Sequence, residues 1–339
     1  MALGTSKMAI DVIPKNFTSR RKMRHYDLVV LAQQPRTLRQ YRAYALIANF
    51  YQRLLPHRLQ DPRTYPVGGH YAVTRSLVAG LSSLDAEFAY QPPLARTTAR
   101  SAIVLAGAKT LHEATEWRRN GHCQLLWAGP NIVEHPHQLD GAILSPHIDG
   151  VVVPSNNVRQ IFETQEPSLE GRVRVWPAGV DEQYWKSSPI PRRDLIVIYN
   201  KRMPDLAHHL EKILRDRGYR CVTLNYGDHR RDKYRPHEFR ALLDRAIACV
   251  FLTYNESQGL AATEAWSMDV PTFAYRAGPT LNIDTIPYMT PDTGRYWSNI
   301  DELLNMFTTY SPSQFRPRAW VLANMTDKIC ANLLLAMMR

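Results

Sequence analysis

The chain has 339 residues, of which 45% are hydrophobic and 22% charged, a composition typical of a globular protein long enough for two domains with separate cores. No apolar run reaches the roughly 18 residues of a membrane-spanning helix, and the first residues lack the uninterrupted apolar core of a signal peptide, so we expect a cytoplasmic protein. The net charge of +11 favours an anionic partner.

The first part of the chain carries the whole excess of positive charge. Residues 1–130 contain 18 Lys and Arg but only 7 Asp and Glu, whereas residues 131–339 contain 24 of each. We expect this part to meet a membrane surface, an acidic acceptor or nucleic acid, and a solvated basic surface without a partner is the alternative. A polar leader, 1–25, precedes a buried strand at 26–32. The basic amphipathic helix predicted at 36–58 fits either anionic lipid headgroups or packing on its own domain.

Alternating strands and helices then complete a first domain, 26–185. Gly68 and Gly69 stand directly before a helical pattern, and such a turn either brings backbone N–H groups to an anion or is only a turn. Ser155 ends the strand expected at 150–155 and is expected to cap the helix that follows it. The expected strands are 101–107, 123–129 and 150–155, and the expected helices lie near 110–120 and at 158–164.

The four cysteines give no sign of a metal site. They are far apart and contain no CxxC pair, so they are expected to be free thiols in the core. The residues are Cys123, Cys221, Cys249 and Cys330.

A Pro/Ser/charge-rich segment, 186–194, is predicted to link the two domains. Strands and helices alternate again in 195–315, and a helical stretch at 316–339 is a candidate for return to the first domain. This pattern predicts an α/β protein with two doubly wound, Rossmann-like domains and parallel sheets.

The segment ESQGLAATEAWSMDVPTFAY, 256–275, concentrates the functional signal. Glu256 follows the carboxyl end of a strand at 247–253, the end at which open α/β sheets bind ligands. Ser257 is expected to cap a helix whose first N–H groups suit a phosphate, and Glu264 to face the same cleft. Two carboxylates so placed can grip the diols of one ligand with a diphosphate between them. The alternative is that Glu256 caps the helix and Glu264 forms a local salt bridge.

The same segment resembles the E-x7-E motif of retaining GT-B glycosyltransferases of the family 4 type, commonly ESFGLxxxEAMAxGxPVVA. VVVPSNNVRQIFE is similar to the strand–Ser–helix that precedes the crossing between their domains. RVRVWPAGVDEQYW is similar to their V-x-P-x-G-V-D-x-x-x-F segment, with Trp185 for Phe. The matching positions of the E-x7-E motif are Glu256, Gly259, Leu260, Glu264, Ala265 and Pro271.

The resemblance implies a GT-B fold, in which two domains face each other across a cleft, with the donor in the second domain and the acceptor in the first. Glu256 would bind the donor sugar and Glu264 the ribose, while backbone groups near Ser257, Gly259 and Leu260 would meet the diphosphate. Lys201 and Arg202 follow the first strand of the second domain, where the family carries phosphate-binding cations. On the acceptor side, His70 is favoured over His135 and His137 for the family's catalytic His. The phosphate and acceptor loops are expected at Gly68, Gly69 and Asn131.

The resemblance also implies a reaction. A hexosyltransferase-like enzyme would move a sugar from a nucleoside-diphosphate sugar to an acceptor hydroxyl with retention, in polysaccharide or glycolipid synthesis, without a cofactor or a metal. A glycan, a lipid-linked or another anionic acceptor, at the membrane periphery, would suit the basic half. The alternatives are a DNA-modifying glycosyltransferase, which is less favoured because no base-reading motif is present, and a non-catalytic sugar- or nucleotide-binding module.

Overall fold

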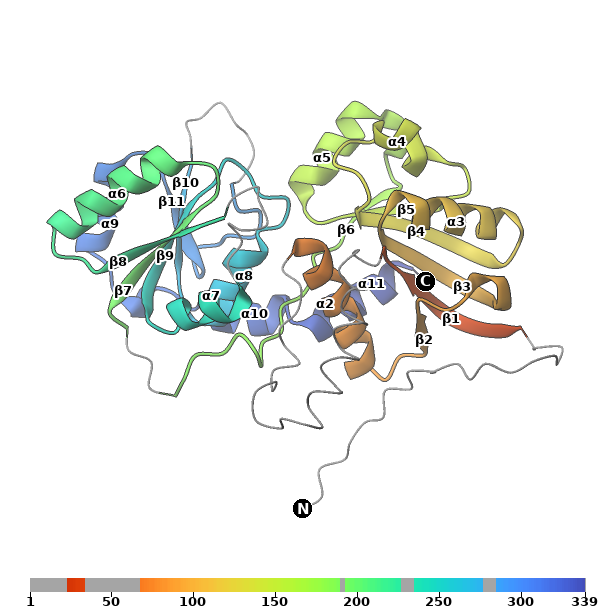
Figure 1. Cartoon of the computed structure of the whole chain (residues 1–339), viewed down its shortest axis with the longest axis horizontal. Coiled ribbons are helices and arrows are strands. Elements are labelled where there is room, and N and C mark those ends of the chain that lie inside the picture. The colour runs from red at the N-terminus through yellow and green to blue at the C-terminus, as the bar shows by residue number, and fades with distance from the viewer. Residues whose placement is uncertain (1–22, 34–67, 190–192, 227–234, 277–284, 339) are drawn as a thin grey trace, which may run out of the picture.

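The computed structural model describes residues 23–33, 68–189, 193–226, 235–276 and 285–338, and these form two α/β units, each built on a parallel sheet (Figure 1). The predicted helix at 36–58 and nearly all of the predicted leader lie outside the described residues. Within the described part of the chain, no helix is long and apolar enough to cross a bilayer.

The first sheet has six parallel strands in the order β2-β1-β3-β4-β5-β6. Its strands are β1 (Arg24–Leu31), β2 (Phe88–Tyr90), β3 (Thr97–Ala106), β4 (Cys123–Asn131), β5 (Gly150–Val153) and β6 (Val173–Val175). The helices in this part of the chain are α2 (Gly69–Ser83), α3 (Ala108–Arg119), α4 (Gln138–Gly141) and α5 (Asn156–Gln165).

The second sheet has five parallel strands in the order β11-β10-β9-β7-β8. Its strands are β7 (Leu195–Asn200), β8 (Cys221–Asn225), β9 (Ala246–Leu252), β10 (Thr272–Tyr275) and β11 (Gly294–Trp297). The helices that follow β7 in the chain are α6 (Pro204–Asp216), α7 (Pro236–Leu243), α8 (Leu260–Ser267), α9 (Ile300–Thr308), α10 (Pro317–Asn324) and α11 (Asp327–Met337).

The strand order of the second sheet fixes where a ligand can bind. The chain starts in the middle of the sheet at β7, adds β8 on one side, and then crosses to β9 on the other side. The crevice of such a sheet opens outside the carboxyl ends of the strands at this reversal. Asn200 at the end of β7 pairs in register with Leu252 at the end of β9, so the residues that follow these two strands meet at one place.

The buried strands behave as their composition predicts. All six residues of β7 are buried, as expected for a central parallel strand that is covered on both faces. The predicted cap of α5 is confirmed, because the Ser155 hydroxyl accepts a hydrogen bond from the Val158 N–H at 3.4 Å. The two parallel sheets confirm the prediction of two parallel-sheet α/β domains.

The start of α8 differs from the prediction. We expected a helix at 258–268 with Ser257 as its cap, but α8 begins at Leu260, and Gly259 occupies the capping position without a side-chain hydrogen bond. Gly259 has φ +83°, a left-handed conformation that glycine adopts at little cost. Ser257 therefore lies in the loop before the helix, two residues ahead of the capping position.

The second domain sends a helix back to the first. α11 lies beside α2 (Figure 1), and Leu334 and Ala331 join the core that Val30, Leu77 and Trp176 form on this side of the first sheet. The segment that leads from the first domain to the second also contacts the residues just before α11, because the Val180 N–H donates to the Met325 carbonyl at 2.9 Å.

The described parts of the predicted linker, 186–194, lie against the second domain. Ser187 donates to the Met268 carbonyl, Ser188 contacts the Asp244 carboxylate at 2.7 and 2.8 Å, and Arg193 donates to the Ala246 carbonyl at 2.7 Å.

Candidate functional site

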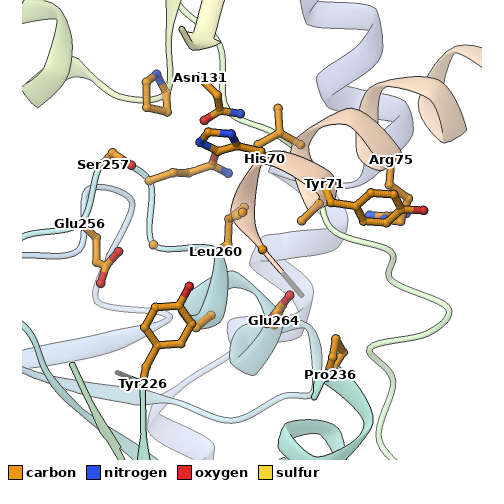
Figure 2. A pocket seen from close by; sticks show the side chains of 18 of the residues that line it. His70, Tyr71, Arg75, Asn131, Tyr226, Pro236, Glu256, Ser257, Leu260 and Glu264 are labelled. Carbon is orange, nitrogen blue, oxygen red and sulfur yellow. The ribbon is translucent and has the colours of Figure 1, made fainter. Parts of the chain in front are cut away.

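A cavity of about 340 Å³ lies where the two domains face each other (Figure 2). The first domain contributes the start of α2, the end of β4 and the residue after β5. The second domain contributes residues after β7, β8 and β9 and the first turns of α8. Its polar lining residues include His70, Arg75, Asn131, Lys201, Glu256 and Glu264.

Glu256 is held by a cation and a hydroxyl. The Lys201 Nζ lies 3.0 Å from each oxygen of the Glu256 carboxylate, and the Thr253 hydroxyl donates to Oε1 at 3.1 Å. Lys201 directly follows β7, and Glu256 lies four residues beyond the end of β9. The adjacency of these two strands therefore brings the two side chains together.

Glu264 lies in the same cavity without a hydrogen bond to its carboxyl group from any residue that the structure describes. Although the residue as a whole is half-buried, its carboxyl group lies deep in the cavity, and this burial raises its pKa to about 8. The positive charge of Arg75 opposes the shift. A carboxyl group without a hydrogen-bond partner can form hydrogen bonds with the hydroxyl groups of a ligand.

Arg75 is a cation of the cavity that sequence reasoning missed. It projects from α2, and its guanidinium forms a bidentate ion pair with Asp327 at the start of α11, with distances of 2.7 and 3.0 Å. The Asp181 carboxylate lies 3.7 Å away. An Arg inside an amphipathic helix carries no sequence signal for a partner 252 positions away.

The first turns of α2 and α8 both line the cavity and lie next to each other. A Cβ atom placed on Gly69 at the start of α2 would lie 3.6 Å from the Leu260 Cδ1 at the start of α8. Because the first N–H groups of a helix lack partners within the helix, each of these two ends favours an anion nearby. α2 lacks a side-chain cap, since Gly68 precedes it.

His70 and Asn131 lie on the first-domain side of the cavity, whereas Glu256, Glu264 and Tyr226 lie on the second-domain side (Figure 2). His70 is exposed in the first turn of α2. Asn131 ends β4 after a cis Gly129–Pro130 peptide, and its Nδ2 is buried without a hydrogen-bond partner among the described residues.

Two tyrosine rings line the cavity near the ends of β7 and β8. The rings of Tyr226 and Tyr199 stack with centroids 6.3 Å apart, and the Lys201 Nζ lies 5.7 Å from the Tyr226 centroid. Tyr226 was not among the predicted site residues, although its place directly after β8 is a signal that could have identified it.

The structure brings together all but one of the predicted site residues. Arg202 is not among the residues that line the cavity, and its side chain is exposed at a position with φ +72°. The ten that line the cavity are Gly68, Gly69, His70, Asn131, Lys201, Glu256, Ser257, Gly259, Leu260 and Glu264.

Among the described residues, no group of three or more His, Cys, Asp or Glu side chains is arranged to hold a metal ion. The four cysteines are buried and free.

No family model and no curated protein matches this sequence, but solved structures resemble its fold. The Anabaena protein Alr3699/HepE, in complex with UDP and glucose, is 11% identical with a TM-score of 0.51, and the match covers 92% of this chain and 99% of that one. The lipopolysaccharide outer core galactosyltransferase WaaB, in its apo form, is 11% identical with a TM-score of 0.52, over 91% and 98%. The catalytic domain of starch synthase IV from Arabidopsis thaliana, bound to ADP and acarbose, is 12% identical with a TM-score of 0.52, over 80% and 78%. These likenesses show that the chain has the GT-B fold.

Proposed function

We propose that this protein is a glycosyltransferase that moves a sugar from a nucleoside-diphosphate sugar to an acceptor hydroxyl, with retention at the anomeric carbon. The observation that carries this proposal is the placement of Glu256 and Glu264 in one cavity, with the first turn of α8 between them. A carboxylate accepts two hydrogen bonds and so fits a vicinal diol. We assign the transferred sugar to Glu256, the ribose to Glu264 and the diphosphate to the start of α8.

In this proposal the chain mainly orients its two substrates. The bond between the anomeric carbon and the phosphate oxygen breaks, a bond to the acceptor oxygen forms on the same face, and the acceptor's proton passes to the departing phosphate. Lys201 and the amino end of α8 would offset the charge of the leaving group, so that no metal ion is required. His70 and Asn131 would face the transferred sugar from the first domain. The acceptor would enter from that side.

Two of the similar structures contain ligands of the kind proposed here. HepE is in complex with UDP and glucose, and the starch synthase IV catalytic domain is bound to ADP and acarbose. They support a nucleoside diphosphate as the common part of the donor.

For the acceptor we propose a glycan, a lipid-linked sugar or another anionic molecule at the surface of a membrane, as in polysaccharide or glycolipid synthesis. The support is the charge excess of +11, all of it within residues 1–130. Binding to anionic vesicles and to duplex DNA at several salt concentrations separates this acceptor from nucleic acid. Vesicle binding that weakens with salt, without comparable DNA binding, is the expected result.

Calorimetric titration with UDP, GDP, dTDP, ADP and CMP tests the donor site. We expect micromolar binding of one nucleoside diphosphate, weakened in Glu264→Ala by roughly 1–3 kcal/mol because a ribose hydroxyl would be left buried without its hydrogen bond to the carboxyl group. Glu211→Ala is the matched control, because Glu211 contacts Arg215 and Thr223 outside the cavity. Binding of none of the five would contradict the proposed function. Binding without transfer or donor hydrolysis would identify a non-catalytic binding module instead.

A further inference from the structure

The ion pair between Lys201 and Glu256 occupies the two groups that the donor needs. Both carboxylate oxygens of Glu256 are 3.0 Å from the Lys201 Nζ, and Oε1 also accepts from Thr253. An ammonium group has three N–H donors, and here it contacts two carboxylate oxygens and lies over the Tyr226 ring. The cation and the carboxylate therefore neutralise each other.

The pair is sheltered from water. The Glu256 side chain is 15% exposed and the Lys201 side chain 27% exposed. Opposite charges attract more strongly where water is partly excluded, so this pair holds each partner more firmly than a surface salt bridge does. A neutral sugar that enters the cavity offers nothing that would separate them.

The other cation of the cavity among the described residues is also paired. Arg75 has a bidentate partner in Asp327 at 2.7 and 3.0 Å, and the Asp181 carboxylate lies 3.7 Å from its guanidinium. A diphosphate therefore meets a described lining in which no cation is spare. It can gain a cation from this lining only by drawing one away from a carboxylate.

On the premise of the proposed function, we infer that Lys201 is a specificity-determining residue that makes sugar recognition conditional on a diphosphate. When the diphosphate reaches the start of α8, Lys201 transfers from the Glu256 carboxylate to the phosphate oxygens. Glu256 then loses its cation and becomes a stronger acceptor for the hydroxyl groups of the donor sugar. A free sugar or an acceptor glycan does not displace Lys201 and is therefore excluded from the donor site.

This exchange has a consequence that a simple sugar-binding role for Glu256 does not have. A nucleoside diphosphate without its sugar must work against the ion pair, but it gains nothing from the released Glu256. Replacing Glu256 by Gln removes the competing charge and keeps an oxygen for Thr253. We therefore expect Glu256→Gln to bind the nucleoside diphosphate about tenfold more tightly than the unaltered chain, while its sugar transfer falls.

The test is a double-mutant cycle measured by calorimetry with the nucleoside diphosphate that binds best. Lys201→Met should weaken binding, and the double variant should bind no more tightly than Lys201→Met, because the gain from Glu256→Gln acts through Lys201. Glu211→Gln is the matched control, since it removes an ion pair of the same domain outside the cavity and should leave binding unchanged. Thermal melting checks that each variant is folded.

The outcomes separate this inference from the proposed function. If the unaltered chain binds a nucleoside diphosphate and Glu256→Gln binds it equally or more weakly, the exchange is wrong and the donor site stands. If Glu256→Gln also tightens binding in the absence of Lys201, the effect is general electrostatics and the role of Lys201 is wrong. If neither the unaltered chain nor Glu256→Gln binds any nucleoside diphosphate, both the proposed function and the exchange are overturned.

Discussion

Gln258 and Ala178 are joined through both ends of one side-chain amide. The Gln258 Nε2 donates to the Ala178 carbonyl at 2.6 Å, and its Oε1 accepts from the Ala178 N–H at 3.0 Å. Gln258 belongs to the loop that carries Glu256, whereas Ala178 belongs to the segment that leads from the first domain to the second. The two hydrogen bonds fix the position of the candidate donor loop relative to this crossing.

Gln258→Leu should destabilise the chain, because the side chain is only 3% exposed and both backbone groups of Ala178 would stay buried without partners. Each unpaired group costs about 1–3 kcal/mol, so a loss of several kcal/mol in the free energy of unfolding is expected in urea titration. Gln160→Leu on the exposed side of α5 should change stability by about 0.5 kcal/mol or less. Equal effects of the two variants would contradict a structural role of the Gln258 amide.

Glu264→Gln should change how stability depends on pH. The Glu264 pKa is about 8 in the folded chain, above the ordinary value of 4.5. Between pH 4.5 and pH 8, therefore, the carboxyl group is protonated in the folded state and ionised in the unfolded state. The native chain therefore loses stability as pH rises from 4.5 toward 8, by about 1.4 kcal/mol for each unit of difference at most. Melting temperatures from pH 5 to pH 9 should show the Gln variant gaining on the native chain as pH rises. A constant difference across this range would mean that Glu264 is already ionised near pH 5.

Arg75→Met should destabilise the contact between α2 and α11. It leaves the Asp327 carboxyl group buried without its bidentate cation, and breaking one partner out of such a pair costs about 3–5 kcal/mol. The double variant Arg75→Met, Asp327→Leu should recover part of the loss because it removes the stranded charge. Urea unfolding measures both, and a double variant that is less stable than the single one would contradict this account.

Gly80→Ala tests how closely α2 and α11 approach. A Cβ atom on Gly80 would lie 2.2 Å from the Asp327 carbonyl oxygen and 2.6 Å from the Ala331 Cβ, so the helices must move apart. Overpacking of this kind costs about 1–3 kcal/mol, even though Ala favours a helix more than Gly does. Ser82→Ala, at an exposed position of the same helix, is the control. Increased stability of Gly80→Ala would show that the contact between the helices is looser than described.

Local patterns predicted the elements that local physics determines. The continuous apolar run of β7 and the hydroxyl cap of α5 each depend on only a few consecutive residues, and both predictions are confirmed. The short strands β2 and β11 were missed. Each has only three or four residues and lies at the edge of its sheet, where partly exposed side chains give no regular pattern.

The candidate site was predictable where a motif follows a strand and not where partners come from far along the chain. Glu256, Glu264 and Lys201 were expected from strand ends and the E-x7-E resemblance, and the structure brings them into one cavity. The contacts of Arg75 with Asp327 depend on the return of α11, and the candidate helical stretch at 316–339 carried no local signal for this pairing. The cap of α8 was wrong because the left-handed Gly259, rather than the Ser257 hydroxyl, turns the chain into the helix.

The packing of α11 on the first domain has a consequence for synthesis on the ribosome. The Trp176 indole N–H donates to the Cys330 carbonyl, 154 residues further along, and Leu334 completes the core around it. When the first sheet has emerged from the ribosome, the part of this core that α11 covers is still open to water, and it stays so until the entire second domain has been translated. The domain made first is thus completed last.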